Sequence, residues 1–272
     1  MFVHEQYEIY REYLLLILGP QFDRLEAEGF TNEADEEFEN YKLKDLIVFR
    51  ACLIGYQPCI DMALKKFGEL KTKCGGEHQL LSDLDCNKLP YYLRPSVYSA
   101  VIEHGTQNDF NFLFDKWKKE HYVVEKDRIW SGLCASNDKN NSDTMWMELL
   151  RNRARESITG RAIACSKFLK KRSYLLDLMI DKYDEITEML HKSDNSFFMM
   201  VQLVSRQVST TEEINKMEKT LEKYSNVFKL NIKQRTDTAM NRVMWRKVDG
   251  PYLVGNATEA VEQMKKYRAK NN

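Results

Sequence analysis

Two cysteines that could form a disulfide, Cys52 and Cys59, stand seven residues apart in a stretch whose composition otherwise predicts helix. Within one helix, residues seven apart are separated by about 10 Å along the axis, whereas a disulfide needs Cα atoms within about 7 Å. Between the cysteines lie Gly55 and Pro58, which predict the end of one helix and the start of another. The two sulfurs can therefore meet across a helical corner, or both can stay reduced as buried apolar side chains.

Residues that could bind a metal are present but poorly spaced. Cys74, His78 and Cys86 could supply three of the four ligands of a zinc site, yet their spacing matches no common zinc motif, and we expect a polar surface loop instead. The segment His4–Glu8 comes nearest to the His-Glu-x-x-His helix of zinc peptidases, but Glu8 stands where the second histidine is needed. We therefore predict no metal site, no catalytic residue and no cofactor in this chain.

Other patterns argue against further classes of protein. The sequence has no Gly-x-x-x-x-Gly-Lys phosphate loop, no Gly-x-Gly-x-x-Gly, no Gly-x-Ser-x-Gly elbow and no Cys-x-x-Cys. The basic runs Lys116–Lys119 and Lys167–Arg172 are expected to be solvated helix faces. Because 41 basic residues balance 41 acidic ones, no net field favours nucleic acid or an anionic membrane surface, and we expect neither as a partner.

Signals for the cellular compartment point in two directions. The longest apolar run, Tyr13–Leu18, is about a third of the roughly 20 residues that span a bilayer, and the N-terminus lacks the features of a signal peptide. These observations favour the cytosol. Two N-glycosylation sequons, at Asn140 and Asn256, instead favour the secretory pathway. Six cysteines in 272 residues do not decide between the two.

Apolar residues recur at spacings of three and four along almost the whole chain, while glycine (11) and proline (5) are scarce. This pattern predicts an all-α fold. A capping box at Ser209–Glu212 is expected to open one of the helices. The expected helices cover residues 5–19, 32–54, 58–71, 93–104, 108–120, 123–135, 142–152, 157–170, 173–190, 194–206, 210–226, 228–245 and 256–269.

The number and length of these helices favour antiparallel helix pairs stacked side by side. Such an arrangement is a superhelical, HEAT- or armadillo-like α-solenoid, and a large compact bundle is the alternative. We expect one domain over residues 1–272. If the domain has a sub-boundary, we expect it near the irregular loop at 72–88.

Four stretches of the first half carry recognisable patterns. The first two are an Ala-Cys…Gly…Cys corner at Leu46–Cys59 and a Leu-Arg…Val-Tyr helix that ends in Gly at Leu89–Gly105. They are followed by an aromatic-rich helix at Asp109–Phe114 and an Ala-Cys-Ser segment at Leu133–Ser136. Their order and spacing resemble the C-terminal helical domain of aminopeptidase N-type zinc aminopeptidases. That family includes the endoplasmic-reticulum, insulin-regulated and glutamyl aminopeptidases. The second half matches more weakly, through Gly160, Phe168–Leu169, Ser209–Ile214 and Asn241–Trp245.

The resemblance implies a disulfide between Cys52 and Cys59 across the corner. A second family disulfide joins the Val-Tyr helix to the Ala-Cys-Ser segment, but Ser99 occupies the first of its positions here, so the resemblance implies that Cys134 is free. It also implies an extracellular or secretory-pathway location, as the ectodomain of a membrane-anchored or secreted parent. A cytosolic relative is the alternative.

The function implied by the resemblance is that of a HEAT- or armadillo-like domain that caps the catalytic domain of a zinc aminopeptidase, encloses its peptide-binding cavity and supports domain closure or dimerisation. The family's His-Glu-x-x-His and Gly-Ala-Met-Glu-Asn motifs are both missing from this sequence. The chain is therefore interpreted as a non-catalytic part of a longer protein or as a lone relative, with zinc expected in the parent's catalytic domain.

The partners implied are that catalytic domain, the peptide substrate and a second copy of the protein. Some family members project a basic residue from the last helices into the cavity, and Arg235 and Arg242 are the candidates here. The alternative function, from another class, is a free-standing helical-repeat module that binds a protein or a peptide.

Overall fold

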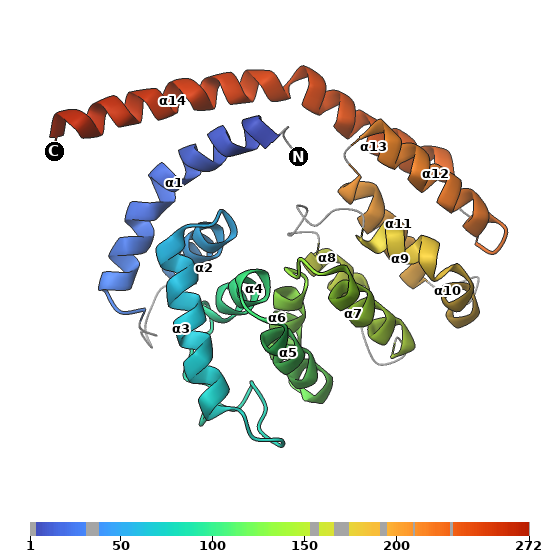
Figure 1. The fold of residues 1–272 in the computed structure, drawn as a ribbon, viewed down its shortest axis with the longest axis horizontal. Helices are drawn as coiled ribbons and strands as arrows, with labels where there is room; N and C mark the ends of the chain where they lie inside the picture. The colour runs from blue at the N-terminus through green and yellow to red at the C-terminus, as the bar shows by residue number, and fades with distance from the viewer. Residues whose placement is uncertain are drawn as a thin grey trace. The chain divides into compact units, whose positions relative to one another are not determined.

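The computed structural model describes residues 4–30, 38–152, 158–165, 174–190, 195–208, 210–228 and 231–271 (Figure 1). Within these ranges the chain forms helices and no strand, so the predicted all-α class is confirmed. The helices are α1 (His4–Ala27), α2 (Phe38–Leu53), α3 (Gln57–Lys73), α4 (Arg94–His104), α5 (Gln107–Lys119), α6 (Val123–Leu133), α7 (Lys139–Arg151), α8 (Ile158–Cys165), α9 (Tyr174–Asp181), α10 (Tyr183–Met189), α11 (Asn195–Gln207), α12 (Thr211–Ser225), α13 (Ile232–Val248) and α14 (Gly250–Asn271).

The chain forms two compact units. The larger unit consists of Phe2–Ala135 together with Tyr252–Asn272, and the smaller unit consists of Ser136–Pro251. The change from one unit to the other therefore falls at Ser136, and the loop at 72–88 lies inside the larger unit.

Helix α4 lies at the centre of the larger unit, where it packs against α2, α3, α5 and α6. Its residues from Val97 to Val101 are almost completely buried, and the same core contains buried aromatic side chains such as Phe67 of α3 and Trp130 of α6. The closest approach is at Gly132 of α6, where an added Cβ would lie 2.5 Å from the Cβ of Tyr98. Only glycine permits α4 and α6 to pack at this distance.

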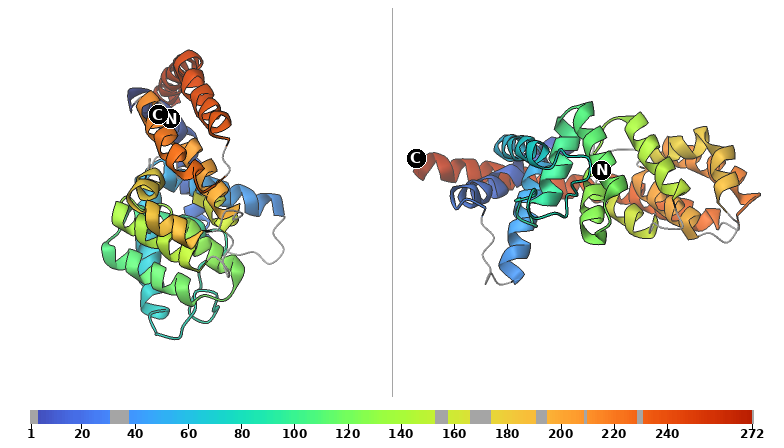
Figure 2. Two further views of the ribbon diagram at one scale, coloured as in Figure 1. Left: turned by 90° about the vertical axis from the view of Figure 1, so that its right-hand side faces the viewer. Right: turned by 90° about the horizontal axis from the view of Figure 1, so that it is seen from below.

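The C-terminal helix returns to the beginning of the chain within the larger unit. Figures 1 and 2 show the later part of α14, in red, beside α1, in blue. Lys265 Nζ of α14 lies 2.5 Å from Glu12 Oε1 of α1, with both side chains about half exposed. An exposed pair of this kind adds about 0–1 kcal/mol to stability.

The smaller unit is built around α11, which packs against α8, α9, α12 and α13. Its core contains an aromatic cluster in which the rings of Phe197 and Phe228 stack with centroids 4.0 Å apart, and Tyr224 lies against both. The Tyr224 hydroxyl is buried and donates a hydrogen bond to the Met179 carbonyl at 2.8 Å. Burial raises the pKa of Tyr224, with smaller contributions from Tyr183 and Asp184.

Several helix boundaries differ from the sequence prediction. Helix α1 continues through Pro20 to Ala27 because the added turns bury Phe22 and Leu25. The single helix expected at 173–190 is divided at Lys182 into α9 and α10. The capping box of α12 is formed by Thr210 and Glu213, one residue later than expected: Glu213 N donates to Thr210 Oγ1, and Thr210 N donates to Glu213 Oε2.

Among the described residues, no single helix has the length and apolar composition needed to cross a bilayer. One pair of helices reaches these limits only when Glu39–Leu53 and Gln57–Lys73 are counted together, and the chain bends by 103° between them.

Candidate functional site: disulfide corner, buried ion network and disulfide loop

The corner between α2 and α3 carries a disulfide. Cys52 lies in the last turn of α2 and Cys59 in the first turn of α3, with an S–S distance of 2.09 Å and Cα atoms 5.2 Å apart. Gly55 has a φ of 79°, which suits glycine, and Pro58 lies in the first turn of α3, where no N–H is needed. The structure therefore joins the same two cysteines that the family resemblance pairs.

Side chains of helix α1 form hydrogen bonds with this corner. Arg11 donates to the carbonyl oxygens of Ile54 at 2.5 Å and Gly55 at 3.1 Å, which are left unpaired at the end of α2. The Tyr56 hydroxyl donates to Asp23 Oδ1 at 2.7 Å. Burial and this hydrogen bond raise the pKa of Tyr56 to about 12, so the hydroxyl stays protonated at neutral pH.

A buried ion network joins α4 to α6. Arg94 Nη1 lies 2.8 Å from Glu125 Oε2, and the two side chains are 1% and 0% exposed. The Tyr98 hydroxyl donates to the other carboxylate oxygen of Glu125 at 2.7 Å. Arg128 also reaches Glu125 Oε2, at 2.9 Å. Burial, and after it the Glu125 carboxylate, raises the pKa of Tyr98 well above its usual value.

Arg94 also fixes the loop that precedes α4. Its guanidinium donates to the carbonyl oxygens of Leu81 at 3.3 Å, Asn87 at 3.1 Å and Leu89 at 3.1 Å. An arginine can donate five N–H groups in a planar fork, so a single side chain can hold the carboxylate and the loop together. The arrangement positions the backbone of the loop, and of the charged groups in the network Arg128, whose side chain is 20% exposed, is the one that reaches the surface.

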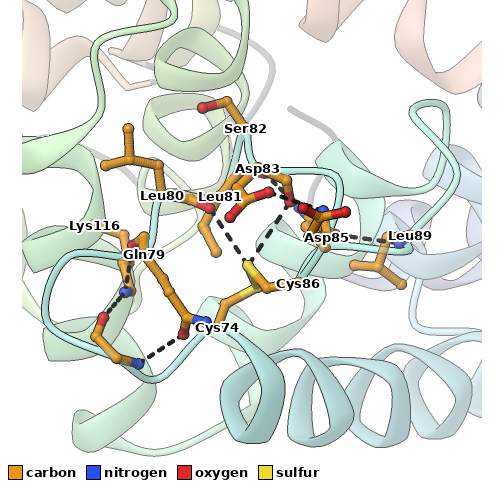
Figure 3. Close-up of a disulfide and its surroundings, with 12 residues drawn as sticks. Cys74, Gln79, Leu80, Leu81, Ser82, Asp83, Asp85, Cys86, Leu89 and Lys116 are labelled. Carbon is orange, nitrogen blue, oxygen red and sulfur yellow. Dashed lines mark hydrogen bonds between the residues drawn. A yellow bond between two sulfur atoms is a disulfide. The ribbon is translucent and has the colours of Figure 1, made fainter.

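The same loop is closed by a second disulfide, between Cys74 and Cys86, with Cα atoms 5.2 Å apart (Figure 3). Lys116 Nζ donates to the Gly76 and Gln79 carbonyl oxygens at 2.9 and 2.7 Å, and Glu120 accepts two hydrogen bonds from Ser82. Lys116 is 4% exposed, so its predicted place on a solvated face is wrong: the loop folds over its side chain. Burial, followed by the charge of Lys119, lowers the pKa of Lys116.

A pocket of about 220 Å³ lies between α3 and this loop. Lys66, Lys73 and Lys88 line it together with Glu69, and Cys86 forms part of its wall. The Cys86 sulfur is committed to the disulfide and the lining contains no histidine, so the pocket offers no thiolate or imidazole nucleophile among the described residues. Its lysines can hold a small anion by charge.

The family of the chain follows from a match that covers most of its length. Residues 1–241 match the family model described as ERAP1-like C-terminal domain. The chain belongs to this family.

The chain is also similar to parts of several known aminopeptidases. It is 21% identical to aminopeptidase N of Plutella xylostella over 229 residues, which is 81% of this chain and 22% of that protein. The identity is 22% to aminopeptidase N of Rattus norvegicus, over 62% of this chain and 17% of the relative. The identity is 27% to endoplasmic reticulum aminopeptidase 1 of Mus musculus, over 47% of this chain and 12% of that protein. The chain thus spans about a fifth or less of these relatives' lengths.

The structure gives the Leu-Arg…Val-Tyr motif of this ERAP1-like domain a physical role. Arg94 and Tyr98 are four residues apart, so both side chains leave α4 on one face and share the Glu125 carboxylate. Glu125 itself was missed in the sequence, because an acidic residue in the first turn of a helix is ordinarily a solvated one. The one available signal was that Arg94 and Tyr98, two hydrogen-bonding side chains, stand one helical turn apart.

Cys134 corrects an expectation drawn from the resemblance. Ser99 stands in place of the family partner and donates its hydroxyl to the carbonyl oxygens of Pro95 and Ser96. Cys134 is nevertheless disulfide-bonded, as is Cys165, so the prediction of a free Cys134 is wrong. All six cysteines lie within the described residues, and none of them is free. The expectation failed because it considered a single partner position.

The other predicted site residues of the ERAP1-like domain do not gather at one place. Arg242 is half-buried and donates to the Ser205 carbonyl at 3.3 Å. Burial, followed by Arg206, lowers the pKa of Arg242. Arg235 is half-buried on the same helix, α13. Asn140, in the first turn of α7, and Asn256, within α14, are both exposed.

The second basic run of the sequence, Lys167–Arg172, lies outside the described residues. Where the structure describes the chain, no three His, Cys, Asp or Glu side chains are grouped so that they could hold a metal ion. The loop with Cys74, His78 and Cys86 is closed by a disulfide, which removes two of the three ligands considered for zinc.

Proposed function

We propose that the chain acts as the non-catalytic C-terminal domain of a zinc aminopeptidase, where it encloses the peptide-binding cavity and supports domain closure or dimerisation. The parent activity would be removal of N-terminal residues from peptides. The observation that carries this proposal is the family match over residues 1–241. The sequence has neither the His-Glu-x-x-His nor the Gly-Ala-Met-Glu-Asn motif, so zinc and the reacting groups would come from the parent's catalytic domain.

The proposed architecture is an α-solenoid of antiparallel helix pairs that forms one domain. In support, helices that follow one another in the chain also pack together within each unit, as α1 does with α2, α5 with α6 and α12 with α13. Contacts between neighbours along the chain are typical of repeat arrays.

A strip of exposed apolar residues on α13 is the surface we propose for docking the catalytic domain. Met240, Met244 and Val248 follow one another at intervals of four, so they share one face, and they are 36%, 49% and 68% exposed. Trp245, at 49%, extends the strip. Contiguous exposed apolar residues of this kind mark interaction surfaces in proteins. The relatives extend far beyond the matched region, and a corresponding region of the parent protein would supply the domain that covers this strip.

Arg235 and Arg242 remain the residues proposed to face the peptide. Both lie on α13, and Arg235 has the more available guanidinium because Arg242 already donates to Ser205. A guanidinium in an enclosed cavity can pair with a peptide carboxylate in a bidentate manner.

We propose an extracellular or secretory-lumen location, with Asn140 and Asn256 as acceptors of N-linked glycans. The disulfides support this proposal, because disulfides persist mainly in oxidising compartments. Both asparagines are exposed, as glycan attachment requires.

Immunodepletion tests the proposed function. An antibody raised against this chain should detect, in extracts and secretions of the source, a protein about four times heavier than the 32.2 kDa of the chain, since 173 matched residues are 17% of one relative and 229 are 22% of another. Its removal should also remove chelator-sensitive hydrolysis of an aminoacyl-amidocoumarin substrate. A depletion with non-immune antibody is the control. A single band near the mass of the chain, with hydrolysis unchanged, would instead favour the free-standing helical-repeat binding module.

A further inference from the structure

The smaller unit contains a pocket that has no place in the proposed function. It has a volume of about 270 Å³ and lies where α12 crosses the junction of α9 and α10. Its floor is apolar, formed by Met179, Ile180 and the ring of Tyr183. Lys216, Lys219 and Lys223 of α12 stand along one wall.

The lysine charges at this wall are only partly compensated. Lys216, Lys219 and Lys223 are spaced by three and four residues, which places them on one face of α12. Lys216 is paired with Asp177 at 2.7 Å. Lys219 and Lys223 are exposed and have no ion pair among the described residues, and the pocket lining contains no acidic side chain there.

This charge distribution disfavours an isolated helix. Lysines four residues apart repel each other, whereas alternation of Glu and Lys at this spacing would stabilise α12. Glu222 stands three residues after Lys219, but neither Glu218 nor Glu222 forms an ion pair with Lys219 or Lys223 among the described residues. An anion in the pocket would relieve the repulsion between Lys219 and Lys223.

The remaining polar side chains of the pocket already donate hydrogen bonds to backbone carbonyl oxygens. Tyr183 donates its hydroxyl to the Lys223 carbonyl at 3.1 Å, and Thr220 donates its hydroxyl to the Lys216 carbonyl at 2.8 Å. Two ammonium groups are therefore the only uncommitted donors of the described lining. Each ammonium can pair with one oxygen of a carboxylate, which is the smallest oxyanion head group that the two can bridge.

We propose that this pocket binds an alkyl carboxylate of medium chain length. The carboxylate pairs with Lys219 and Lys223, and the alkyl chain lies against Met179, Ile180 and Tyr183. A mostly apolar pocket with a few convergent polar groups is the usual form of a small-molecule site. The inference does not depend on the aminopeptidase role, because it uses none of the α13 residues proposed for docking or for peptide contact.

Calorimetric titration of the full 272-residue chain with octanoate tests the proposal. Saturable binding is expected, and it should weaken with added salt. Octylammonium, which has the same chain and the opposite charge, and acetate, which has the same head group and no chain, should not bind. The double variant Lys219→Gln, Lys223→Gln should bind about tenfold more weakly or worse, since it loses two charge-assisted hydrogen bonds.

The matched control is the double variant Lys233→Gln, Lys247→Gln, which removes two exposed lysines of α13 and should bind like the unaltered chain. Ile180→Glu, at a residue already 36% exposed, should abolish binding by placing a carboxylate in the pocket. Circular dichroism melts establish that each variant is folded. The proposal is overturned if octylammonium binds as well as octanoate, if the α13 variant weakens binding equally, or if octyl phosphate is clearly preferred.

Discussion

At the scale of single residues, the Glu125 carboxylate organises the most deeply buried polar cluster of the larger unit. It receives hydrogen bonds from Arg94, Tyr98 and Arg128, and its side chain has no exposed surface. A buried ion pair of this type adds little net stability over apolar packing, but removing one partner leaves an uncompensated charge. We infer that the pair contributes more to the choice of which helix faces meet than to overall stability.

Replacing Glu125 by Gln should be strongly destabilising. The amide keeps the size of the carboxylate but leaves Arg94 charged and buried without its counter-ion, which costs about 3–5 kcal/mol. Urea unfolding followed by circular dichroism measures the change. The control is Glu222→Gln on the exposed face of α12, expected to alter the free energy of unfolding by less than about 0.5 kcal/mol. A loss below about 1 kcal/mol for Glu125→Gln would contradict this account.

Gly132 is the second single residue on which the packing of α4 and α6 depends. Alanine at this position gains about 1 kcal/mol of helix propensity but places its Cβ 2.5 Å from the Tyr98 Cβ and 3.1 Å from its backbone carbonyl carbon. The overpacking costs about 1–3 kcal/mol, so we expect a net loss of stability. Gly68→Ala in α3, where no atom lies within 4 Å, should instead be stabilising. If Gly132→Ala and Gly68→Ala changed the melting temperature equally, the close approach of α4 and α6 would not restrict the side chain at position 132.

At the scale of elements, short polar links fasten neighbouring helices. Lys71 of α3 donates to Asp109 of α5 at 2.7 Å, and the same carboxylate accepts from the Thr106 amide at 2.8 Å. The link therefore joins two helices and also caps the N-terminus of α5. Burial acts against ionisation of Asp109, but the hydrogen bonds from Lys71 and Thr106 outweigh it and lower the pKa of the carboxyl.

This link predicts a loss of stability in acid. Because the pKa of Asp109 is lower in the folded chain than in the unfolded one, its stabilisation is complete above the unfolded value of about 3.9 and is lost as the pH falls through the folded value. Urea midpoints measured at about pH 5 and about pH 2.5 should differ more for the unaltered chain than for Asp109→Asn. An identical pH dependence in both proteins would mean that Asp109 is not linked to folding.

The helices and their order could be predicted from periodicity, yet two kinds of feature could not. The extension of α1 past Pro20 depends on the burial of Phe22 and Leu25, which tertiary packing decides. The burial of Lys116 depends on a loop about 40 residues earlier that supplies two carbonyl acceptors. Local sequence carries no sign of such distant partners. The helical corner between Cys52 and Cys59 was predictable because its glycine and proline lie within one short stretch, whereas the pairing of the two cysteines came from the family resemblance.

At the scale of the whole molecule, the cysteines predict a fully oxidised protein. Chain secreted from an oxidising host, digested without reduction, should yield peptides linked through Cys52–Cys59 and Cys74–Cys86, because each pair has Cα atoms 5.2 Å apart. No cysteine should react with a thiol-alkylating reagent before reduction. Alkylation of all six without reduction would place the chain in a reducing compartment and contradict the proposed location.

The two short disulfide loops also bear on how a cell makes this chain. Their cysteines are seven and twelve residues apart, and a loop of roughly ten residues closes within about 10–100 ns. Six cysteines could otherwise pair in about 15 ways. Both bonds can form while the later helices are still being synthesised, before distant cysteines compete. In the proposed secretory location, correct pairing of these two bonds should therefore require little help from disulfide isomerases.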